Sequence, residues 1–230
     1  MALYTIGDLH LALSDTYKPM DIFAGWEGYT EKLETNWRSV VKDEDTVVLA
    51  GDISWAMKLQ NSYRDFEFVN SLPGRKIILK GNHDYWWSTM SKMERYFREN
   101  GFDTVNILFN NSYEYENYGI CGTRGWVNTG DEVTEDEKVL LREVQRLEVS
   151  VKSALEKGLE PLVFMHYPPV YGSWCNYDIL DVLYRYDIKK CFYGHIHGYS
   201  QKNAVTGIRD GVEYIMISGD YLKFMPYRIV

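Results

Sequence analysis

The sequence predicts an α/β fold, in which short buried strands alternate with amphipathic helices. One observation behind this prediction is the order of elements in the first hundred residues, where apolar runs alternate with stretches of helical period. The other is how the apolar runs end, because several stop abruptly at small residues followed by residues able to bind a metal. Chemistry placed at the carboxyl ends of buried strands is typical of α/β proteins.

The first half of the chain supplies three strands and three helical stretches. In order, we expect a strand at 3–6, a helix from 30, a strand at 46–50, a helical stretch at 63–72, a strand at 76–79 and a helix at 88–99. Leu33 and Trp37 lie on one face of the first helix at helical spacing. Pro73-Gly74 ends the second helical stretch, and Asn100-Gly101 is a good signal for the end of the third.

The second half is predicted to add a hairpin, a long helix and several more strands. Residues 105–109 and 112–121 read as two strands joined by a turn at Asn110-Asn111. The long helix has one apolar stripe, made of Leu140, Val144, Leu147, Val151 and Ala154. Further elements are expected as strands at 162–165, 190–193, 212–217 and 225–229 and a helix at 178–186. No repeat or linker interrupts the pattern, so a single domain over residues 1–230 is predicted.

Composition limits the class of function. With 230 residues, of which 45% are hydrophobic and 25% charged, the chain fits a soluble globular protein with a sizeable core. Its net charge of -8 disfavours extended nucleic acid and anionic membrane surfaces as partners. A small anionic substrate remains compatible with this charge wherever metal ions reverse the local potential.

The cysteines and the hydropathy pattern predict a cytoplasmic protein. The three cysteines, Cys121, Cys175 and Cys191, are widely spaced, which gives neither a disulfide framework nor a zinc knuckle. The sequence has no apolar run approaching the ~20 residues that a membrane span requires, and it opens directly on a strand.

All five histidines follow predicted strand ends, and three further ligand-type residues accompany them. These eight residues are His10, His83, His166, His195 and His197, together with Asp8, Asp52 and Asn82. A single buried histidine is more often a hydrogen-bonded core residue, but five at strand ends indicate a metal cluster. Imidazole and carboxylate ligands suit manganese, iron, zinc or nickel. So many ligands fit two ions that share a carboxylate, for which Asp52 is the natural bridge; two-metal sites with ions ~3.5–4 Å apart serve phosphoryl displacement.

The ordered motifs resemble those of the calcineurin-like metallophosphoesterase superfamily. They are Asp8-x-His10, Gly51-Asp52, Gly81-Asn82-His83-Asp84, His166 and Gly194-His195-x-His197. Individually, Gly-Asp and Asp-x-His are weak signals, but the ordered set spans most of the chain and is highly specific. The resemblance implies a four-layer αββα sandwich: two mixed β-sheets flanked by helices, with a dinuclear metal site at the strand ends.

The resemblance also implies a role for each motif residue. The first ion would bind Asp8, His10 and His197, the second Asn82, His166 and His195, and Asp52 would bridge both. A hydroxide shared by two divalent or trivalent ions would attack phosphorus. His83 matches the family's non-ligand histidine and would protonate the leaving oxygen or bind a phosphoryl oxygen. The substrates expected on this basis are small phosphodiesters or phosphomonoesters, including nucleotide-like ones.

Two positions depart from the serine/threonine protein phosphatases of the superfamily. Trp55 stands where their second motif has a further aspartate, and Asp84 replaces a glutamate. The pattern is closer to the bacterial phosphodiesterases. A nuclease, a protein phosphatase-like enzyme and a non-catalytic interaction module on the same fold are the alternatives, although every motif position expected of an enzyme is filled.

Arg124 and a group of aromatic residues lie outside the motifs, and each allows a substrate-binding and a structural interpretation. Arg124 lies in a Gly-rich break and would either clamp a phosphate through its fork of donors or stabilise the turn. The loops after the strands are rich in aromatic residues, which would either stack on a nucleobase or pack the loops. These aromatic residues are Tyr85, Trp86, Trp87, Trp126, Tyr167, Tyr171, Trp174 and Tyr177. The metal identities and the oligomeric state stay open.

Overall fold

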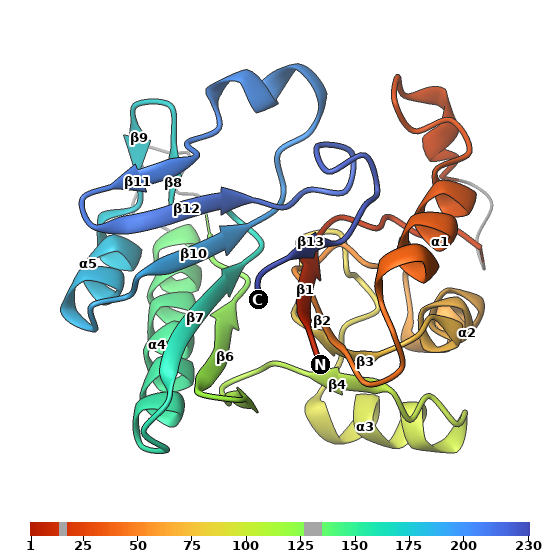
Figure 1. Ribbon diagram of the computed structural model, residues 1–230, viewed down its shortest axis with the longest axis horizontal. Coiled ribbons are helices and arrows are strands. Elements are labelled where there is room, and N and C mark those ends of the chain that lie inside the picture. The colour runs from red at the N-terminus through yellow and green to blue at the C-terminus, as the bar shows by residue number, and fades with distance from the viewer. Residues whose placement is uncertain (14–17, 127–134) are drawn as a thin grey trace.

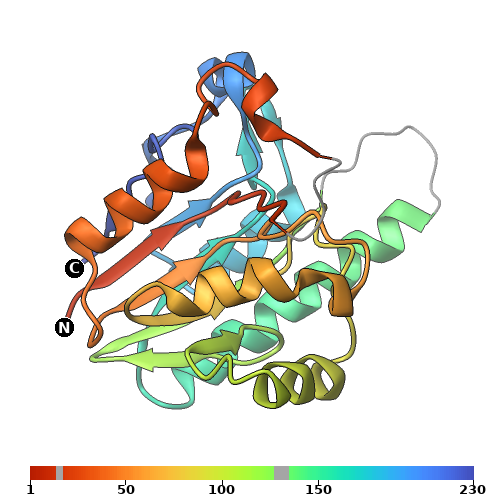
Figure 2. The same cartoon turned by 90° about the vertical axis from the view of Figure 1, so that its right-hand side faces the viewer.

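The computed structural model describes residues 1–13, 18–126 and 135–230. Two β-sheets pack face to face, and helices cover the outer face of each sheet (Figures 1 and 2). This is the predicted four-layer α/β arrangement of two mixed sheets flanked by helices. The first sheet comes mainly from the first half of the chain and the second from the other half.

The first sheet has five strands in the order β13-β1-β2-β3-β4. Its strands are β1 (Leu3–Ile6), β2 (Thr46–Leu49), β3 (Arg75–Ile78), β4 (Val105–Ile107) and β13 (Tyr227–Arg228). β1 to β4 are parallel, whereas β13 pairs antiparallel with β1. The helices on this side are α1 (Tyr29–Val40), α2 (Tyr63–Ser71) and α3 (Met90–Glu99).

The second sheet has six strands in the order β11-β12-β10-β7-β6-β5. They are β5 (Tyr113–Tyr115), β6 (Tyr118–Thr123), β7 (Glu160–Met165), β10 (Lys190–Tyr193), β11 (Gly207–Arg209) and β12 (Val212–Met216). Its four inner strands are parallel and its two edge strands antiparallel. Helices α4 (Glu135–Leu155) and α5 (Tyr177–Arg185) cover its outer face.

Smaller elements complete the described chain. A two-stranded hairpin is formed by β8 (Val170–Tyr171) and β9 (Trp174–Cys175). Short 3-10 helices are η1 (Met20–Ile22), η2 (Leu59–Ser62) and η3 (Gly198–Asn203). In the described residues, no helix is long and apolar enough to cross a membrane.

Alternating side chains of each strand explain the layers. In β2, Val47 and Leu49 pack with the helices, whereas Val48 packs against the second sheet. In β7, Val163 packs toward α4 and α5, whereas Phe164 points between the sheets. Successive side chains of a strand point to opposite faces, so both faces of each central strand are buried. This is why these strands read as continuous apolar runs in the sequence.

One sequence-based prediction was wrong: residues 105–109 and 112–121 do not form a hairpin. β4 pairs with β3 in the first sheet, whereas β5 and β6 belong to the second. Asn111 therefore lies in a crossing between sheets, where its side chain accepts a hydrogen bond from Phe109 N and donates to Ile107 O. The real hairpin turn follows Tyr115, with Glu116 at φ 52°. Asparagine favours a turn, but it does not determine whether the flanking strands pair.

The carboxyl ends of the parallel strands meet at a single edge of the sandwich. There, Gly7 and Ser218 form a parallel bridge that links the end of β1 to the end of β12. Gly7 N donates to Ile217 O over 2.7 Å. Residues that follow β1, β2 and β3 are thereby brought beside residues that follow β7 and β10.

The sheet-to-sheet contact should dominate stability. Phe164 and Phe192 stack between the sheets with ring centroids 4.8 Å apart, and both are fully buried. We predict that Phe164→Ala lowers the free energy of unfolding by about 3–5 kcal/mol, because it leaves a cavity in the centre of the sandwich. Urea unfolding measures this loss. Phe23→Ala, at a residue that is 53% exposed, is the control and should change stability by less than about 0.5 kcal/mol. Equal effects of the two substitutions would contradict the prediction.

Candidate metal centre

Four of the predicted metal ligands have a left-handed backbone. Asp8, His10, Asp52 and His195 have φ values of 58°, 44°, 51° and 73°. A residue with a side chain costs about 1–3 kcal/mol in such a conformation, and this kind of strain gathers at functional sites. The loops after β1, β2 and β10 are therefore shaped to aim side chains and not only to reverse the chain.

Two glycines of the motifs provide room for this packing. A Cβ on Gly81 would lie 2.1 Å from Asp52 Oδ1, and one on Gly194 would lie 2.5 Å from Asp8 Oδ2. Both glycines have ordinary backbone angles, since neither is among the residues with positive φ. Their role is to let another chain segment approach closely, so that two carboxylates fit beside the strand ends.

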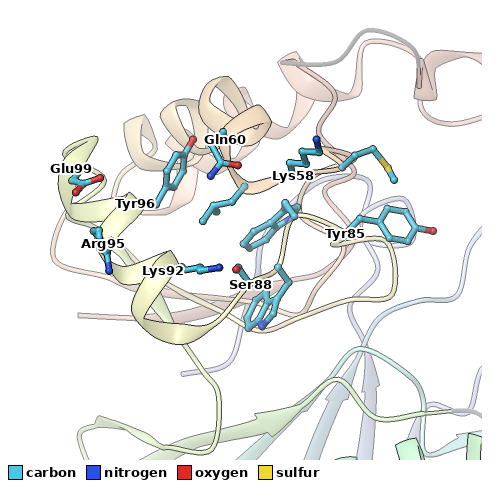
Figure 3. A pocket seen from close by; sticks show the side chains of 12 residues that line it. Lys58, Gln60, Tyr85, Ser88, Lys92, Arg95, Tyr96 and Glu99 are labelled. Atoms are coloured by element: carbon cyan, nitrogen blue, oxygen red, sulfur yellow. The ribbon is translucent and has the colours of Figure 1, made fainter. Parts of the chain in front are cut away.

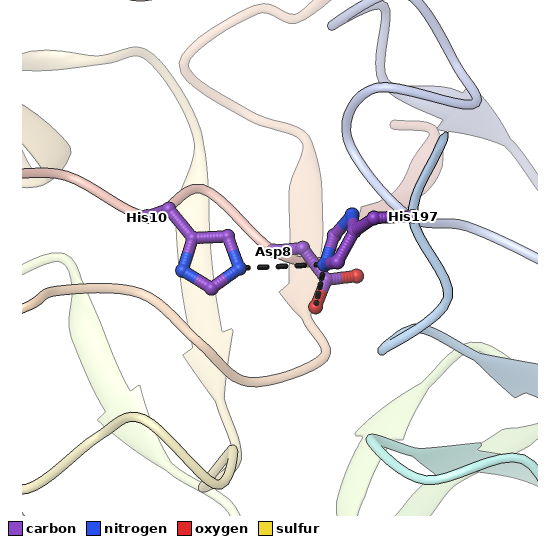
Figure 4. Close-up of side chains that lie close together, drawn as sticks. All are labelled: Asp8, His10 and His197. Atoms are coloured by element: carbon purple, nitrogen blue, oxygen red, sulfur yellow. Dashed lines mark hydrogen bonds and ion pairs between the residues drawn. The ribbon is translucent and has the colours of Figure 1, made fainter. Parts of the chain in front are cut away.

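The first group of candidate ligands consists of Asp8, His10 and His197 (Figure 4). His10 Nε2 lies 3.4 Å from His197 Nε2, which in turn lies 3.6 Å from Asp8 Oδ1. Asp8 is fully buried and His10 nearly so, whereas His197 is partly exposed. One carboxylate and two imidazoles thus converge from residues separated by most of the chain.

The second group consists of Asp52, His166 and His195. His166 Nε2 lies 3.2 Å from His195 Nδ1 and 2.6 Å from the side-chain oxygen of Asn82. His166 Nδ1 lies 3.1 Å from Ala50 O, a contact in which the ring nitrogen donates. That hydrogen bond leaves Nε2 with a free lone pair that points at the other members of the group.

Asp52 connects the two groups. Its Oδ2 atom lies 3.7 Å from His10 Nε2 and 3.4 Å from His166 Nε2. Its other oxygen, Oδ1, accepts a hydrogen bond of 2.7 Å from His83 N. A single carboxylate oxygen therefore faces one histidine of each group.

The donor set fits cations. Burial, together with the charges of Asp84 and Asp8, raises the pKa of Asp52 to about 9. Burial also lowers the pKa of His195 to about 3, with neighbouring His166 adding to the effect. The pKa values of His10 and His166 are lowered by burial too, whereas the charge of Asp8 and the hydrogen bond with Asp220 overcome burial and raise the pKa of His197 to about 10. A cation would take the place of the proton on His197, bind the lone pairs of the neutral imidazoles and remove the repulsion between the carboxylates. Within the part of the chain that is described, the residues present therefore fit metal ions.

Asp84 holds the two loops that present Asp52 and Asn82. The fully buried carboxylate accepts hydrogen bonds from Gly81 N and Asp52 N through Oδ2, at 2.7 and 2.9 Å. Its Oδ1 accepts from Ile53 N and from the indole nitrogen of Trp86, both at 2.8 Å. The last residue of the Gly-Asn-His-Asp motif thus organises the backbone around the ligands.

Asp220 is a functional candidate that the sequence reasoning missed. Its Oδ1 atom accepts a hydrogen bond of 2.9 Å from His197 Nδ1, and its Oδ2 accepts from Gly198 N and Gln201 Nε2. It therefore fixes the orientation of His197, with Nε2 directed at Asp8. A signal was present, because a Gly-Asp pair, Gly219-Asp220, comes soon after the end of β12, with Ile217 and Ser218 between, much as Gly7-Asp8 follows β1.

His83 lies beside the two groups. Its ring is 4.3 Å from the ring of Trp55 and 5.7 Å from that of His10, measured between centroids. Its Nδ1 lies 3.4 Å from the hydroxyl of Tyr85, which is half exposed. Burial lowers the pKa of His83 to about 4, with the charges of His166 and Lys18 adding to the effect.

Arg124 is held by contacts of its own. Its guanidinium lies 3.4 Å from Glu143 Oε1 and 4.6 Å from the centre of the Trp126 ring. Arg124 O accepts a hydrogen bond from Tyr167 N, so its backbone runs next to His166. The prediction that Arg124 binds phosphate stays a prediction, and it requires the guanidinium to exchange Glu143 for the substrate.

Two cavities adjoin the loops of this centre. One of about 430 Å³ is lined partly by His195 and His197. The other, of about 530 Å³, lies between η2, the loop after His83 and α3 (Figure 3). Its lining includes the three basic residues Lys58, Lys92 and Arg95 and one acidic residue, Glu99, and in the described residues no acidic side chain forms an ion pair with the three basic ones. An otherwise acidic protein thus has a basic cavity along the loop that bears His83.

Comparison with known proteins agrees with this site. The Calcineurin-like phosphoesterase family matches residues 1–199, so the chain belongs to this family. The protein is accordingly a metal-dependent phosphoesterase of a family that uses divalent metal ions and acts on small phosphoesters. Among curated protein sequences no significant match is found.

Solved structures of similar fold cover nearly the whole chain. A protein of unknown function from Aquifex aeolicus is 18% identical with a TM-score of 0.52, over 99% of this chain and 95% of that one. Phosphopantetheinyl hydrolase from Mycobacterium tuberculosis is 14% identical with a TM-score of 0.60, over 100% and 95%. A protein from Thermus thermophilus, TT1561, is 11% identical with a TM-score of 0.58, over 93% and 87%. At these identities the likeness supports the fold alone.

The contact between Asp220 and His197 can be tested through metal affinity. We predict that Asp220→Asn weakens binding of manganese about 10- to 100-fold, because His197 loses the carboxylate that orients its ring and increases its basicity. Competition with a chelator of known affinity measures the change. Asp210→Asn, at an exposed aspartate paired with Arg209, is the matched control and should bind manganese as the wild type does. Unchanged affinity in Asp220→Asn would show that His197 needs no such partner.

Proposed function

We propose that the protein is a dinuclear metal-dependent hydrolase of small phosphodiesters or phosphomonoesters, including nucleotide-like ones. The observation that supports it most directly is the position of Asp52 Oδ2 between His10 Nε2 and His166 Nε2, at 3.7 and 3.4 Å. A carboxylate oxygen that faces a histidine of each group suits a bridge between two ions. The single domain over residues 1–230 and the cytoplasmic location predicted from sequence belong to the same proposal.

The residues divide into ligands and a proton donor. In this proposal Asp8, His10 and His197 hold one ion, Asn82, His166 and His195 hold the other, and Asp52 contacts both. Bound cations would supply Lewis acidity at these residues, which would polarise the phosphoryl oxygens and make water nucleophilic near neutral pH. Manganese, iron, zinc and nickel all suit these ligands.

His83 is the residue best placed to act on the substrate directly. It is partly exposed and its ring borders the ligand groups, while its backbone N–H is fixed on Asp52. Trp55 packs against one side of the ring and limits its movement. We assign it the transfer of a proton to the leaving oxygen, a contribution of typically ~10²–10⁴ in rate. Burial lowers the pKa of the ring in the free protein, so this role requires the negative charge of a bound phosphate ester to raise that pKa and keep the ring protonated.

Hydrolysis of a panel of esters tests the proposal. Bis-p-nitrophenyl phosphate, p-nitrophenyl phosphate, a nucleoside monophosphate, a phosphopantetheine ester and DNA should be assayed with each divalent ion, before and after chelation. We expect turnover of at least one ester that chelation abolishes and manganese restores. No turnover with any ion would favour an interaction module on the same fold, and cleavage restricted to DNA would favour a nuclease.

The division of roles predicts different losses in two variants. His83→Ala should retain both metal ions but lose ~10²–10⁴ in kcat, because only the proton donor is removed. Asp52→Asn should lose metal as well as activity, because the neutral amide no longer offsets two cations. Metal content and kcat are measured on the same samples, with Asp210→Asn as the surface control. Full activity of His83→Ala on an ester with a poor leaving group would contradict its role.

A further inference from the structure

The cavity beside His195 and His197 has walls unlike those of the metal centre. Besides the two histidines, its lining consists of Pro168, Tyr171, Trp174, Ile196 and Ser200. Among these described residues there is no lysine, arginine, aspartate or glutamate. The cavity of about 430 Å³ therefore combines a largely apolar wall with direct access to two candidate ligands.

The β8–β9 hairpin supplies the aromatic part of the wall. Tyr171 and Trp174 are directly opposite each other in its antiparallel ladder, so their side chains leave the same face of the ribbon. Val170 and Cys175 form the other pair; Val170 is buried in the core between the second sheet and its helices, and Cys175 packs against that core. Tyr171 packs against the same core as well as lining the cavity, whereas Trp174 lines the cavity without being part of that core cluster. Figure 1 shows the hairpin at the edge of the structure, near α5 and β11.

The hairpin is tied to the segment that follows the metal ligands. The Tyr171 hydroxyl donates a hydrogen bond of 2.9 Å to Ser200 O in η3, and Tyr171 also forms an isolated bridge with Ala204. Because η3 begins directly after His197, these contacts fix the wall of the cavity relative to His197. The wall of the cavity is therefore held in a fixed position beside the candidate metal ligands.

Within the described residues, the ring of Trp174 has no hydrogen bond, no aromatic neighbour and no place in a hydrophobic cluster. Trp86, by contrast, is buried against Phe66, and Trp126 packs against Tyr167. A large apolar ring left partly exposed beside a site of chemistry is a common mark of ligand contact.

We propose that this cavity binds an uncharged planar ring in the organic group of the substrate, stacked on Trp174. This inference rests on the proposed phosphoesterase function and names the substrate class of the same site. A charged ring is disfavoured because no lysine, arginine or carboxylate of the described lining would offset its desolvation. A flexible alkyl chain is disfavoured because it loses more rotational freedom on binding than a rigid ring does.

Phosphonates test the proposal without turnover, because their carbon–phosphorus bond is not an ester. Inorganic phosphate and methyl-, benzyl-, hexyl- and 4-carboxybenzylphosphonate are titrated calorimetrically into the manganese-loaded protein. We expect benzylphosphonate to bind at least about tenfold more tightly than methylphosphonate, the gain of one stacked ring. Hexyl- and 4-carboxybenzylphosphonate should both bind more weakly than benzylphosphonate.

Substitutions at Trp174 locate the effect. In Trp174→Ala, the affinity for benzylphosphonate should fall close to that for methylphosphonate. Trp174→Phe should retain most of the difference in affinity between the two compounds. The control is Tyr177→Ala, which removes an aromatic side chain that is 78% exposed and lies outside the cavity lining. Unfolding midpoints and methylphosphonate affinity should be the same in all variants, which separates the loss of the ring from a loss of fold or of metal.

The outcomes separate this subsite from the function on which it rests. Suppose that methylphosphonate and inorganic phosphate bind, but the wild type binds benzylphosphonate no more tightly than methylphosphonate, or Trp174→Ala keeps the preference for benzylphosphonate. Either result overturns the subsite and leaves the proposed phosphoesterase function intact. Tighter binding of the hexyl or carboxylated compound also overturns it. If neither methylphosphonate nor phosphate binds and no ester is hydrolysed, the proposed function fails and the subsite with it.

Discussion

Three carboxylates buried at one edge of the sandwich are the constraint on which the structure of this site depends. Asp8, Asp52 and Asp84 are each 1% exposed or less, and burial opposes the ionisation of all three. The charges of Asp84 and Asp8 raise the pKa of Asp52 further, whereas neighbouring histidines lower the pKa of Asp8. Asp84 is satisfied by backbone and indole N–H groups, which tie two loops together. Asp8 and Asp52 instead face imidazole nitrogens. Bound cations would offset the negative charge of these buried carboxylates. Four candidate ligands, Asp8, His10, Asp52 and His195, have a left-handed backbone that holds their side chains in this arrangement.

The fold follows from how the sheets bring distant segments to this edge. Parallel strands all point their carboxyl ends the same way, so each loop after β1, β2, β3, β7 and β10 delivers side chains to one place. The bridge between Gly7 and Ser218 joins the two sheets there. Asp220 reaches His197 through the same junction, because the loop after β12 lies beside the loop after β10. The site is therefore a property of the sandwich as a whole.

Much of this was predictable from the sequence, and the failures have physical causes. Strands buried on both faces appear as short apolar runs, and the candidate ligands follow them directly, so both patterns were visible in the sequence. The pairing of residues 105–121 was not, because whether two strands share a sheet depends on contacts far away in sequence. Asp220 was missed although Gly219-Asp220 repeats the pattern of Gly7-Asp8. The unpartnered ring of Trp174 could emerge only from the packing, since a sequence does not show which aromatic residues find neighbours.

The central claim is that one chain holds two ions on these two groups, with Asp52 between them. The direct measurement is anomalous diffraction from crystals of the manganese-loaded protein, combined with metal content per chain in solution. The account predicts two ions per chain, one contacting Asp8, His10 and His197 and the other Asn82, His166 and His195, with Asp52 contacting both. A single ion, or two ions that do not share the Asp52 carboxylate, would contradict it.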